Sequence, residues 1–522
     1  MRFVNSVRNS AVMLLWQLLN VVAGFVLRTV FIKQLGFDYL GLNSVMESVL
    51  MLLSMAELGI GTSVAFALYG PIERGDEAKI GTLMAFYRRV YHVIAIITAV
   101  LGLLLVPFLN VITNGAADVI PNVTAIYLLF LTNTVLSYFF SYRRTLVSAY
   151  QLHYINSTNE NIFLLIKYIL QAVVLIVSRN YLLFLVIQIC CVFLSNVFIY
   201  RKTSKMYPFL RQYRNERLPK EDGTLMRKSV VSLMFQRLSA ALVTGTDNLM
   251  INSVGLVVMG IYSNYSMIIS TISRVLSQVF QSVIGSVGNL MVQDDDQYKY
   301  GVYKEMMFIN FAVYFTISVV LGSAAERFIH LWVGEAGVMS PWITFVVLMN
   351  FYMTGMRQTN ILVIDSSGLF NHLRLKAVLE VFINLAVSFL FLIVFQMGVY
   401  GVLLGTTVSI AATCLWWEPY VIFKYAFRSS SLPYFIKYGV YFAVTLITAV
   451  LSRLVCDQIP GDGFGALVLS GLVSFAFAAA AVLLLFGRTR EFQSLWARCK
   501  GLAAGFHKSK GAENERKKHH DI

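Results

Sequence analysis

Charged side chains lie inside long apolar stretches of this 522-residue chain, where few kinds of chemistry need them. An ionisable residue at the centre of a bilayer-spanning helix costs roughly 2.5 to 3.5 kcal/mol on insertion scales, so it is kept mostly where it binds a ligand, an ion or another charge. Guanidinium groups match phosphate oxygens in charge and geometry. The cations in these stretches therefore predict an anion-binding site, whose candidates are Arg28, Arg237, Arg274 and Arg357.

Two acids in apolar stretches are candidates for binding a proton or another ion, or for neutralising an arginine. Glu57 stands in the middle of "MAELGIGT", where a carboxylate can relay a proton, bind a coupling ion or pair with an arginine such as Arg274. Asp247 can pair with Arg28 or share a substrate contact with it. A purely structural role, in hydrogen bonds between helices, stays open for Arg28 and Asp247 and for each of the other three arginines.

The composition places all these charges in a membrane protein. Hydrophobic residues make up 57% of the chain, charged residues only 13%, and apolar stretches of about 20 residues recur throughout. A soluble domain is excluded, and the sequence predicts an all-α polytopic membrane protein. The five cysteines form no CxxC or Cys/His cluster, so no metal, cofactor or catalytic group is predicted and an enzyme is not expected.

Apolar runs bounded by charges, glycine and proline predict about 14 spans, with 12 or 13 as alternatives. They begin near residues 11, 40, 90, 123, 161, 181, 229, 258, 306, 341, 375, 399, 434 and 465. With this count, 33 of the 42 Lys and Arg residues fall on one side of the membrane and four on the other. Because basic residues gather on the cytoplasmic side of membrane proteins, both termini are predicted to be cytoplasmic. The expected location of the protein is the inner (plasma) membrane. The net charge of +15 then reflects contact with anionic lipid headgroups, and nucleic acid is not an expected partner.

A second signal is an internal repeat. Sliding the chain by 219 residues aligns residues 8–44 with residues 227–263 without a gap, and ten of the 37 positions are identical. The matches include Gly36 with Gly255 and Gly41 with Gly260. We interpret this as a duplication, and expect the glycines to allow a short turn at the outer surface and close helix approach.

An even number of spans separates the copies, so both enter the membrane in the same direction and make a parallel repeat. The predicted organisation is an N-terminal six-helix lobe (1–200), a basic cytoplasmic linker (201–228) and a C-terminal six-helix lobe (229–423). Two additional spans (424–486) and a basic cytoplasmic tail (487–522) follow. A substrate path is expected in a central cavity between the lobes, which would alternate access by rocking.

The repeat also sorts the polar residues of the first span of each lobe. Gln17 and Arg28 are eleven residues apart, which places them within about 20° of one helix face. Gln236 and Asp247 are their equivalents in the second copy. Gln17 and Gln236 therefore join the arginines as candidate substrate-binding residues. Lys167 lies near the cytoplasmic end of its span, where its long side chain could reach the interface.

Five segments carry a resemblance to a known family: "LRTVFIKQLGFDYLGLNS", "SMAELGIGTSVAFALYGPI", "TDNLMINSVGLVVMGIYSNY", "HLWVG" and "YGVLLGTTVS". Together they resemble polysaccharide repeat-unit flippases, of the multidrug/oligosaccharidyl-lipid/polysaccharide exporter superfamily, over residues 5 to 485. The resemblance implies translocation of undecaprenyl-pyrophosphate-linked oligosaccharide to the outer leaflet for O-antigen, capsular or related polysaccharide. Arg28, Glu57 and Asp247 match the family's motifs, whereas Arg237, Arg274 and Arg357 match none.

The expected partners are the lipid-linked oligosaccharide, membrane lipids and a downstream polymerase. Two alternatives differ in their expected charges. A drug or cation exporter of the same superfamily should favour an acidic cavity. A membrane glycan polymerase or glycosyltransferase should carry catalytic groups in a large outer loop, which this chain lacks: the longest outer connection runs from Ser323 to Pro341.

Overall fold

The computed structural model describes residues 2–57, 60–216, 239, 241–282, 287 and 295–497. This part of the chain is helical or in turns, and eleven of its helices are long and apolar enough to cross a membrane. The predicted all-α polytopic fold is therefore confirmed. Three of the 14 predicted spans do not appear as separate long helices. The first two predicted spans are joined in α1 (Arg2–Leu53), and the seventh lies partly outside the described residues. The tenth is the short helix α12 (Pro341–Met356).

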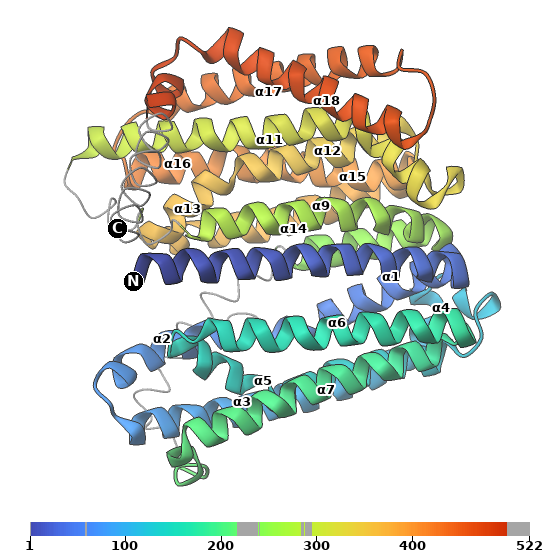
Figure 1. The fold of residues 1–522 in the computed structure, drawn as a ribbon, viewed down its shortest axis with the longest axis vertical. Helices are drawn as coiled ribbons and strands as arrows, with labels where there is room; N and C mark the ends of the chain where they lie inside the picture. Colours follow the sequence, from blue (N-terminus) through green and yellow to red (C-terminus); the bar gives the residue numbers. More distant parts are fainter. Residues whose placement is uncertain are drawn as a thin grey trace, which may run out of the picture. The chain divides into compact units, whose positions relative to one another are not determined.

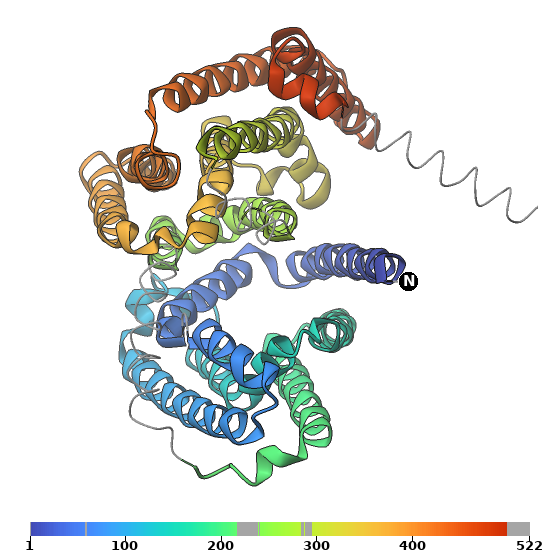
Figure 2. The same ribbon diagram turned by 90° about the vertical axis from the view of Figure 1, so that its left-hand side faces the viewer.

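The described helices belong to two compact units. The first unit comprises residues 1–271 and 373–409, and the second comprises residues 272–372 and 410–522. Within each unit, neighbouring helices run largely side by side (Figure 1 and Figure 2). The predicted lobes, 1–200 and 229–423, follow the duplication instead of these units, and they stay a prediction.

Local sequence explains where several helices of the first unit begin and end. The aspartate cap of α3 (Glu77–Leu105) is Asp76, whose side chain accepts the Lys79 amide at 2.9 Å. Helices α6 (His153–Ser178) and α7 (Tyr181–Met206) are separated at Arg179, which has φ +51°, and Asn180, which caps α7. This "SRN" break confirms that two spans stand where the apolar runs almost merge.

Side chains from α3, α5 (Val123–Ala149) and α7 hold the first unit together. Helix α5 packs against α3 and α7, and α1 packs against α6. Four buried tyrosines pack edge to face between α3 and α5: Tyr87, Tyr91, Tyr138 and Tyr142. Such aromatic pairs add about 0.5 to 1.5 kcal/mol each beyond the area they bury.

The remaining helices of the first unit come from the second copy of the repeat and from residues after it. They are most of α9 (Leu256–Ser282), α14 (Arg374–Phe389) and α15 (Gly398–Ser409), and α14 packs along α15. Shorter elements complete the unit: η1 (Ser54–Glu57), α2 (Ile60–Glu73), η2 (Val106–Phe108), α4 (Leu109–Ile112), η3 (Ala116–Asp118), η4 (Pro208–Arg211) and the π turn η7 (Leu390–Val394).

The second unit is built on α11 (Asp296–Val333), which packs against α12, α17 (Leu432–Cys456) and α18 (Phe464–Ala481). Helices α17 and α18 lie alongside α11 in Figure 1. Gly334, with φ +85°, ends α11 before η5 (Glu335–Gly337). The other elements are α13 (Gln358–Ser367), η6 (Leu369–Leu373), α16 (Leu415–Tyr425) and the π turns η8 (Ile410–Cys414) and η9 (Val482–Phe486).

The repeated glycines meet one another inside the first unit. Gly36 breaks α1 with φ +85°, and the helical pattern is also interrupted at Gly255. A Cβ added to Gly41 would overlap the backbone oxygen of Leu256, and one added to Gly260 would overlap that of Phe37. Positions 37 and 41 are the repeat equivalents of 256 and 260, so the two copies cross through a reciprocal contact that only glycine allows.

Side-chain hydrogen bonds connect residues 112–114 to the second repeat copy, just before Gly255. The Asn114 amide donates to the backbone oxygens of Asn252 at 3.3 Å and Ser253 at 3.4 Å. The Asn252 amide in turn donates to the backbone oxygen of Ile112 at 3.0 Å. These hydrogen bonds connect the end of α4 and the residues before η3 to the second copy of the repeat.

We expect Gly41→Ala to separate the two copies at this crossing, because the new methyl group would occupy the position of a backbone oxygen. The separation can be measured as a loss of crosslinking between Asn114→Cys and Ser253→Cys with a short thiol-specific linker. Gly439→Ala is the matched control, since an added Cβ there has no atom within 4 Å. Unchanged crosslinking in Gly41→Ala would contradict the close crossing.

Candidate functional site

Arg28 is held by two neutral side chains of α9. Its Nε donates to the Asn264 side-chain oxygen at 3.0 Å, and its Nη2 donates to the Ser263 hydroxyl. Ser263 and Asn264 are buried on α9, and Ser263 is the repeat equivalent of Ser44. Among the described residues, no carboxylate lies within ion-pair distance of the Arg28 guanidinium. Its charge is therefore held by dipoles that an anion can supplement or replace.

Arg28 lines two open cavities of the first unit, of about 660 and 780 Å³ including their mouths. The cavity toward α6 is lined by amide, cationic and aromatic side chains that include Asn43, Lys167, Tyr168 and Gln171. The cavity toward α9 is lined by hydroxyl and amide groups from α1, from residue 248 and from α9: Ser44, Ser48, Asn248, Ser263, Ser266 and Ser270. Polar groups in these cavities can hydrogen-bond a hydrated or sugar-bearing ligand.

Glu47 is the acid that the structure brings near Arg28. It lines both cavities with Arg28 and is exposed there, and it accepts a hydrogen bond from the Asn43 amide at 2.9 Å. Asn43 accepts in turn from the Tyr181 hydroxyl at 3.0 Å. The sequence places Arg28 and Glu47 on opposite arms of the Gly36 turn, and this signal could have identified the pair.

Lys167 is a second cation that sequence reasoning assigned to the membrane interface. It lines the cavity of Arg28, and also a smaller cavity beside Arg144 and Glu160. Its ammonium lies 5.1 Å from the ring centre of Tyr168, and it has no ion-pair partner among the described residues. Lys167 therefore faces two cavities of the first unit.

Asp247 has a different partner from Arg28. It is 7% exposed, and the Thr406 hydroxyl donates to its Oδ2 at 2.5 Å. The Asn384 amide donates to Thr406 Oγ1 at 3.2 Å, and Asp247 Oδ1 has no hydrogen-bond partner in the described part of the chain. The Arg28–Asp247 pair considered from the sequence is not formed in this structure, because each side chain binds a different helix.

The Arg357 guanidinium binds a carboxylate within the second unit. At the junction of α12 and α13, its Nη2 donates to Glu418 Oε1 at 2.6 Å and its Nε donates to Oε2 at 3.1 Å. Glu418 is 2% exposed. This two-pronged pair is the geometry that arginine would offer a phosphate, so the structure favours a structural role for Arg357 over the predicted anion contact.

The other predicted residues are placed as follows. Gln17 is half-buried on α1 and does not line the cavities of Arg28. Arg274 is exposed on α9, without a hydrogen-bond or ion-pair partner among the described residues. Gln236 and Arg237 lie outside the described residues, as does the side chain of Glu57, the last residue of η1. Within the first unit, the structure thus brings Arg28 together with Glu47 and Lys167 around one cavity.

Comparison with known proteins gives a fold. No protein-family model and no curated protein matches the chain. Among solved structures it is similar to lipid II flippase MurJ in an inward closed conformation, with a TM-score of 0.64 and 13% identity over 92% of this chain and 100% of that one. It is also similar to an inward-facing multidrug resistance MATE family transporter of the MOP superfamily, with a TM-score of 0.52 and 12% identity over 77% of this chain and 94% of that one. The chain therefore has the polytopic helical fold found in these transporters.

We expect Arg357→Gln to destabilise the second unit, because it leaves the Glu418 carboxylate buried without its partner. Removing one member of a buried ion pair costs about 3 to 5 kcal/mol, whereas replacing both members by neutral groups costs less. Thermal unfolding of the purified protein should therefore place Arg357→Gln below the double variant Arg357→Gln/Glu418→Gln. A double variant that is no more stable than Arg357→Gln would show that the pair is not coupled.

Proposed function

We propose that this protein moves undecaprenyl-pyrophosphate-linked oligosaccharide from the inner to the outer leaflet, by alternating access, for the synthesis of a surface polysaccharide. The observation that carries the proposal is Arg28: a membrane-embedded guanidinium that lines two polar cavities and is bound only by Ser263 and Asn264 among the described residues. A pyrophosphate needs such a cation, because the bilayer core cannot solvate its charge.

The cavities suit the two parts of this substrate that must leave the lipid. Arg28 and Lys167 line the same cavity and offer two positive charges to a pyrophosphate. The hydroxyl and amide groups of the second cavity offer donors and acceptors to sugar hydroxyls. The prenyl chain is apolar and can stay in the bilayer while the headgroup crosses.

The resemblance to polysaccharide repeat-unit flippases supports the same conclusion. It covers residues 5 to 485, and Arg28 lies in the first of its segments. The fold shared with a lipid II flippase agrees with transport of a lipid-linked molecule, although at 13% identity that likeness concerns architecture alone. The expected location is the plasma membrane with both termini in the cytoplasm, and the expected partners are membrane lipids and a downstream polymerase.

Asp247 is the proposed coupling group. A buried carboxylate without a cationic partner is stable only if it is protonated or if it binds a cation. Asp247 has one oxygen bound to Thr406 and one without a partner in the described chain, so it can take up a proton or a monovalent cation. Loading and release of that ion would bias the two halves of the transport cycle.

A multidrug or cation exporter is the nearest alternative. It should line its cavity with uncompensated acids, whereas the cavity toward α6 holds two cations, Arg28 and Lys167, and one acid, Glu47. A membrane glycan polymerase is a more distant alternative, and both solved structures above are transporters by their titles. The charge of the cavity therefore favours an anionic substrate.

We expect Arg28→Ala to slow flipping of a lipid-linked oligosaccharide in reconstituted vesicles by about ten- to a hundredfold. Hydrogen bonds to charged groups contribute roughly 1.5 to 3 kcal/mol, and about 1.4 kcal/mol corresponds to a factor of ten. Arg28→Lys should recover part of the rate, since it keeps the charge but not the planar fork. Arg179→Ala, at the turn between α6 and α7, is the control. A wild-type rate of flipping by Arg28→Ala, at equal protein levels, would contradict the proposal.

We expect Asp247→Asn to keep the fold but lose the response to an ion gradient, because an amide can accept from Thr406 but cannot exchange a proton or balance a cation. Flipping is measured in vesicles with and without an imposed proton or sodium gradient. Wild type and the control Asp118→Asn should be stimulated by one of the gradients, whereas Asp247→Asn should flip equally with and without it. Equal stimulation of all three proteins would exclude Asp247 as the coupling group.

A further inference from the structure

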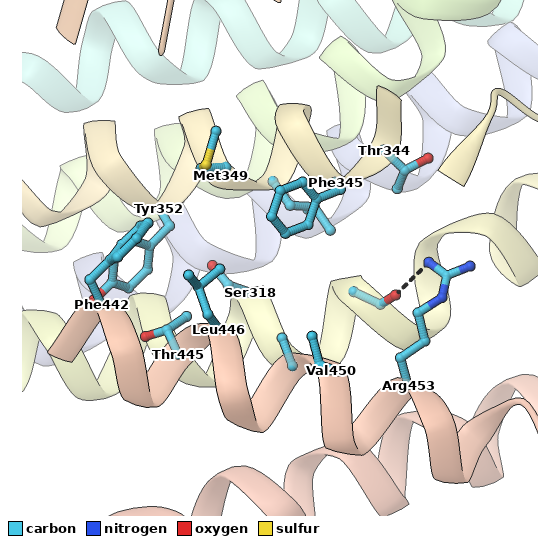
Figure 3. Close-up of a pocket in the computed structure, with 13 residues that line it drawn as sticks. Ser318, Thr344, Phe345, Met349, Tyr352, Phe442, Thr445, Leu446, Val450 and Arg453 are labelled. Atoms are coloured by element: carbon cyan, nitrogen blue, oxygen red, sulfur yellow. Dashed lines mark hydrogen bonds between the residues drawn. The ribbon is translucent and has the colours of Figure 1, made fainter. Parts of the chain in front are cut away.

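A separate groove lies in the second unit, between α12 and α17 on one side of α11 (Figure 3). It encloses about 630 Å³ counted to its open side. Its walls are mostly apolar, with Phe345, Leu348, Met349, Phe442, Leu446 and Val450 among the lining residues. Phe345 and Val450 are exposed at its edge, 40% and 53% respectively, which in a membrane places the open side against lipid.

The groove has the length of a lipid chain within one leaflet. It extends along α12 from Thr344 to Tyr352, which is about 12 Å at the rise of an α-helix. Half of the hydrocarbon core of a bilayer is about 15 Å thick. The Arg453 end lies near the end of α17 that the charge pattern places outside, so the groove spans most of the outer leaflet.

Two buried hydroxyls line the groove and lack an acceptor. Ser318 on α11 is 6% exposed and Thr344 on α12 is 2% exposed, and neither hydroxyl has a hydrogen-bond partner in the described part of the chain. By contrast, Thr316 on the same α11 donates to the Ala312 backbone oxygen at 2.7 Å. Burying a hydroxyl without a partner is unfavourable, so a ligand that brings acceptors into the groove would be favoured.

Charges of both signs stand at the mouth of the groove. Arg453 pairs with Glu326 at 2.7 Å and donates to the Gly322 backbone oxygen at 3.4 Å. Its Nε lies 3.8 Å from an Asp457 oxygen, which is beyond hydrogen-bond distance. A phosphate oxygen can therefore accept from Nε, while the Glu326 and Asp457 carboxylates can attract an ammonium group.

From this arrangement we propose that the groove binds one glycerophospholipid whose headgroup carries both a phosphate and a primary ammonium. One acyl chain fills the groove, an ester carbonyl accepts from Ser318 or Thr344, and the headgroup lies on Arg453, Glu326 and Asp457. A polyprenyl phosphate fits less well, because its hydrocarbon offers no carbonyl acceptor and its headgroup no ammonium. A purely anionic lipid would meet two carboxylates at the mouth. The inference concerns a bound membrane lipid, and it does not depend on the proposed transport substrate.

The experiment uses the full-length protein, extracted in mild detergent from a membrane with phosphatidylethanolamine, phosphatidylglycerol and cardiolipin, and measured by native mass spectrometry. We expect one phosphatidylethanolamine per chain to be retained in excess of the other lipids. Ser318→Ala and Thr344→Val should each reduce retention at least threefold, and Ala449→Phe, which fills the groove, should abolish it. Matched controls are Thr316→Val on α11 and Ala443→Phe at an exposed position of α17, and both should retain the lipid.

The outcomes separate the possible occupants. Retention of a polyprenyl phosphate or an anionic lipid in place of phosphatidylethanolamine would overturn the inference. So would the absence of any retained lipid, or equal retention by Ala449→Phe and Ala443→Phe. Because Ser318→Ala removes one oxygen atom and leaves the helix intact, loss of lipid from that variant cannot be ascribed to misfolding when its thermal unfolding matches that of Thr316→Val.

Discussion

The contact of Arg28 with Ser263 and Asn264 is the interaction on which the functional site depends. A guanidinium inside a membrane needs hydrogen-bond acceptors around it, and the structure provides a hydroxyl and an amide oxygen from α9. These acceptors carry no net charge. Arg28 is thus held in place by its contacts with α9, and its positive charge remains able to attract an anion.

Three charges in the predicted membrane spans are accommodated in three different ways, and the difference is informative about function. Arg357 is neutralised by Glu418 through two hydrogen bonds, which leaves little to offer a ligand. Asp247 is enclosed with Thr406 and lacks a cation among the described residues. Arg28 alone of the three opens onto large polar cavities. On the proposed function, these are a structural charge, a coupling charge and a substrate-binding charge.

The sequence predicted features that depend on local chemistry or on the repeat. The "SRN" break appears at Arg179 because a left-handed residue and an asparagine cap are encoded side by side. The Gly41–Gly260 contact could be predicted because the duplication repeats the two glycines at the same spacing. The partners of the charged side chains could not be predicted in this way. Glu418 follows Arg357 by 61 residues and lies on another helix, so only the packing of α16 against α13 reveals the pair. For Glu47 the signal was present, yet Glu57 was preferred because it stands at the centre of an apolar run.

The duplication also explains how one fold can hold two opposite charges at equivalent positions. Arg28 and Asp247 are related by the same 219-residue shift that relates Gly41 to Gly260. The glycines stayed identical because the backbone crossing tolerates no Cβ on either copy. Positions 28 and 247 carry side chains with different neighbours: Ser263 and Asn264 for Arg28, and Thr406 for Asp247. Packing therefore preserved the symmetry of the crossing, while the surroundings of each copy allowed its charge to diverge toward a separate task in the proposed transport cycle.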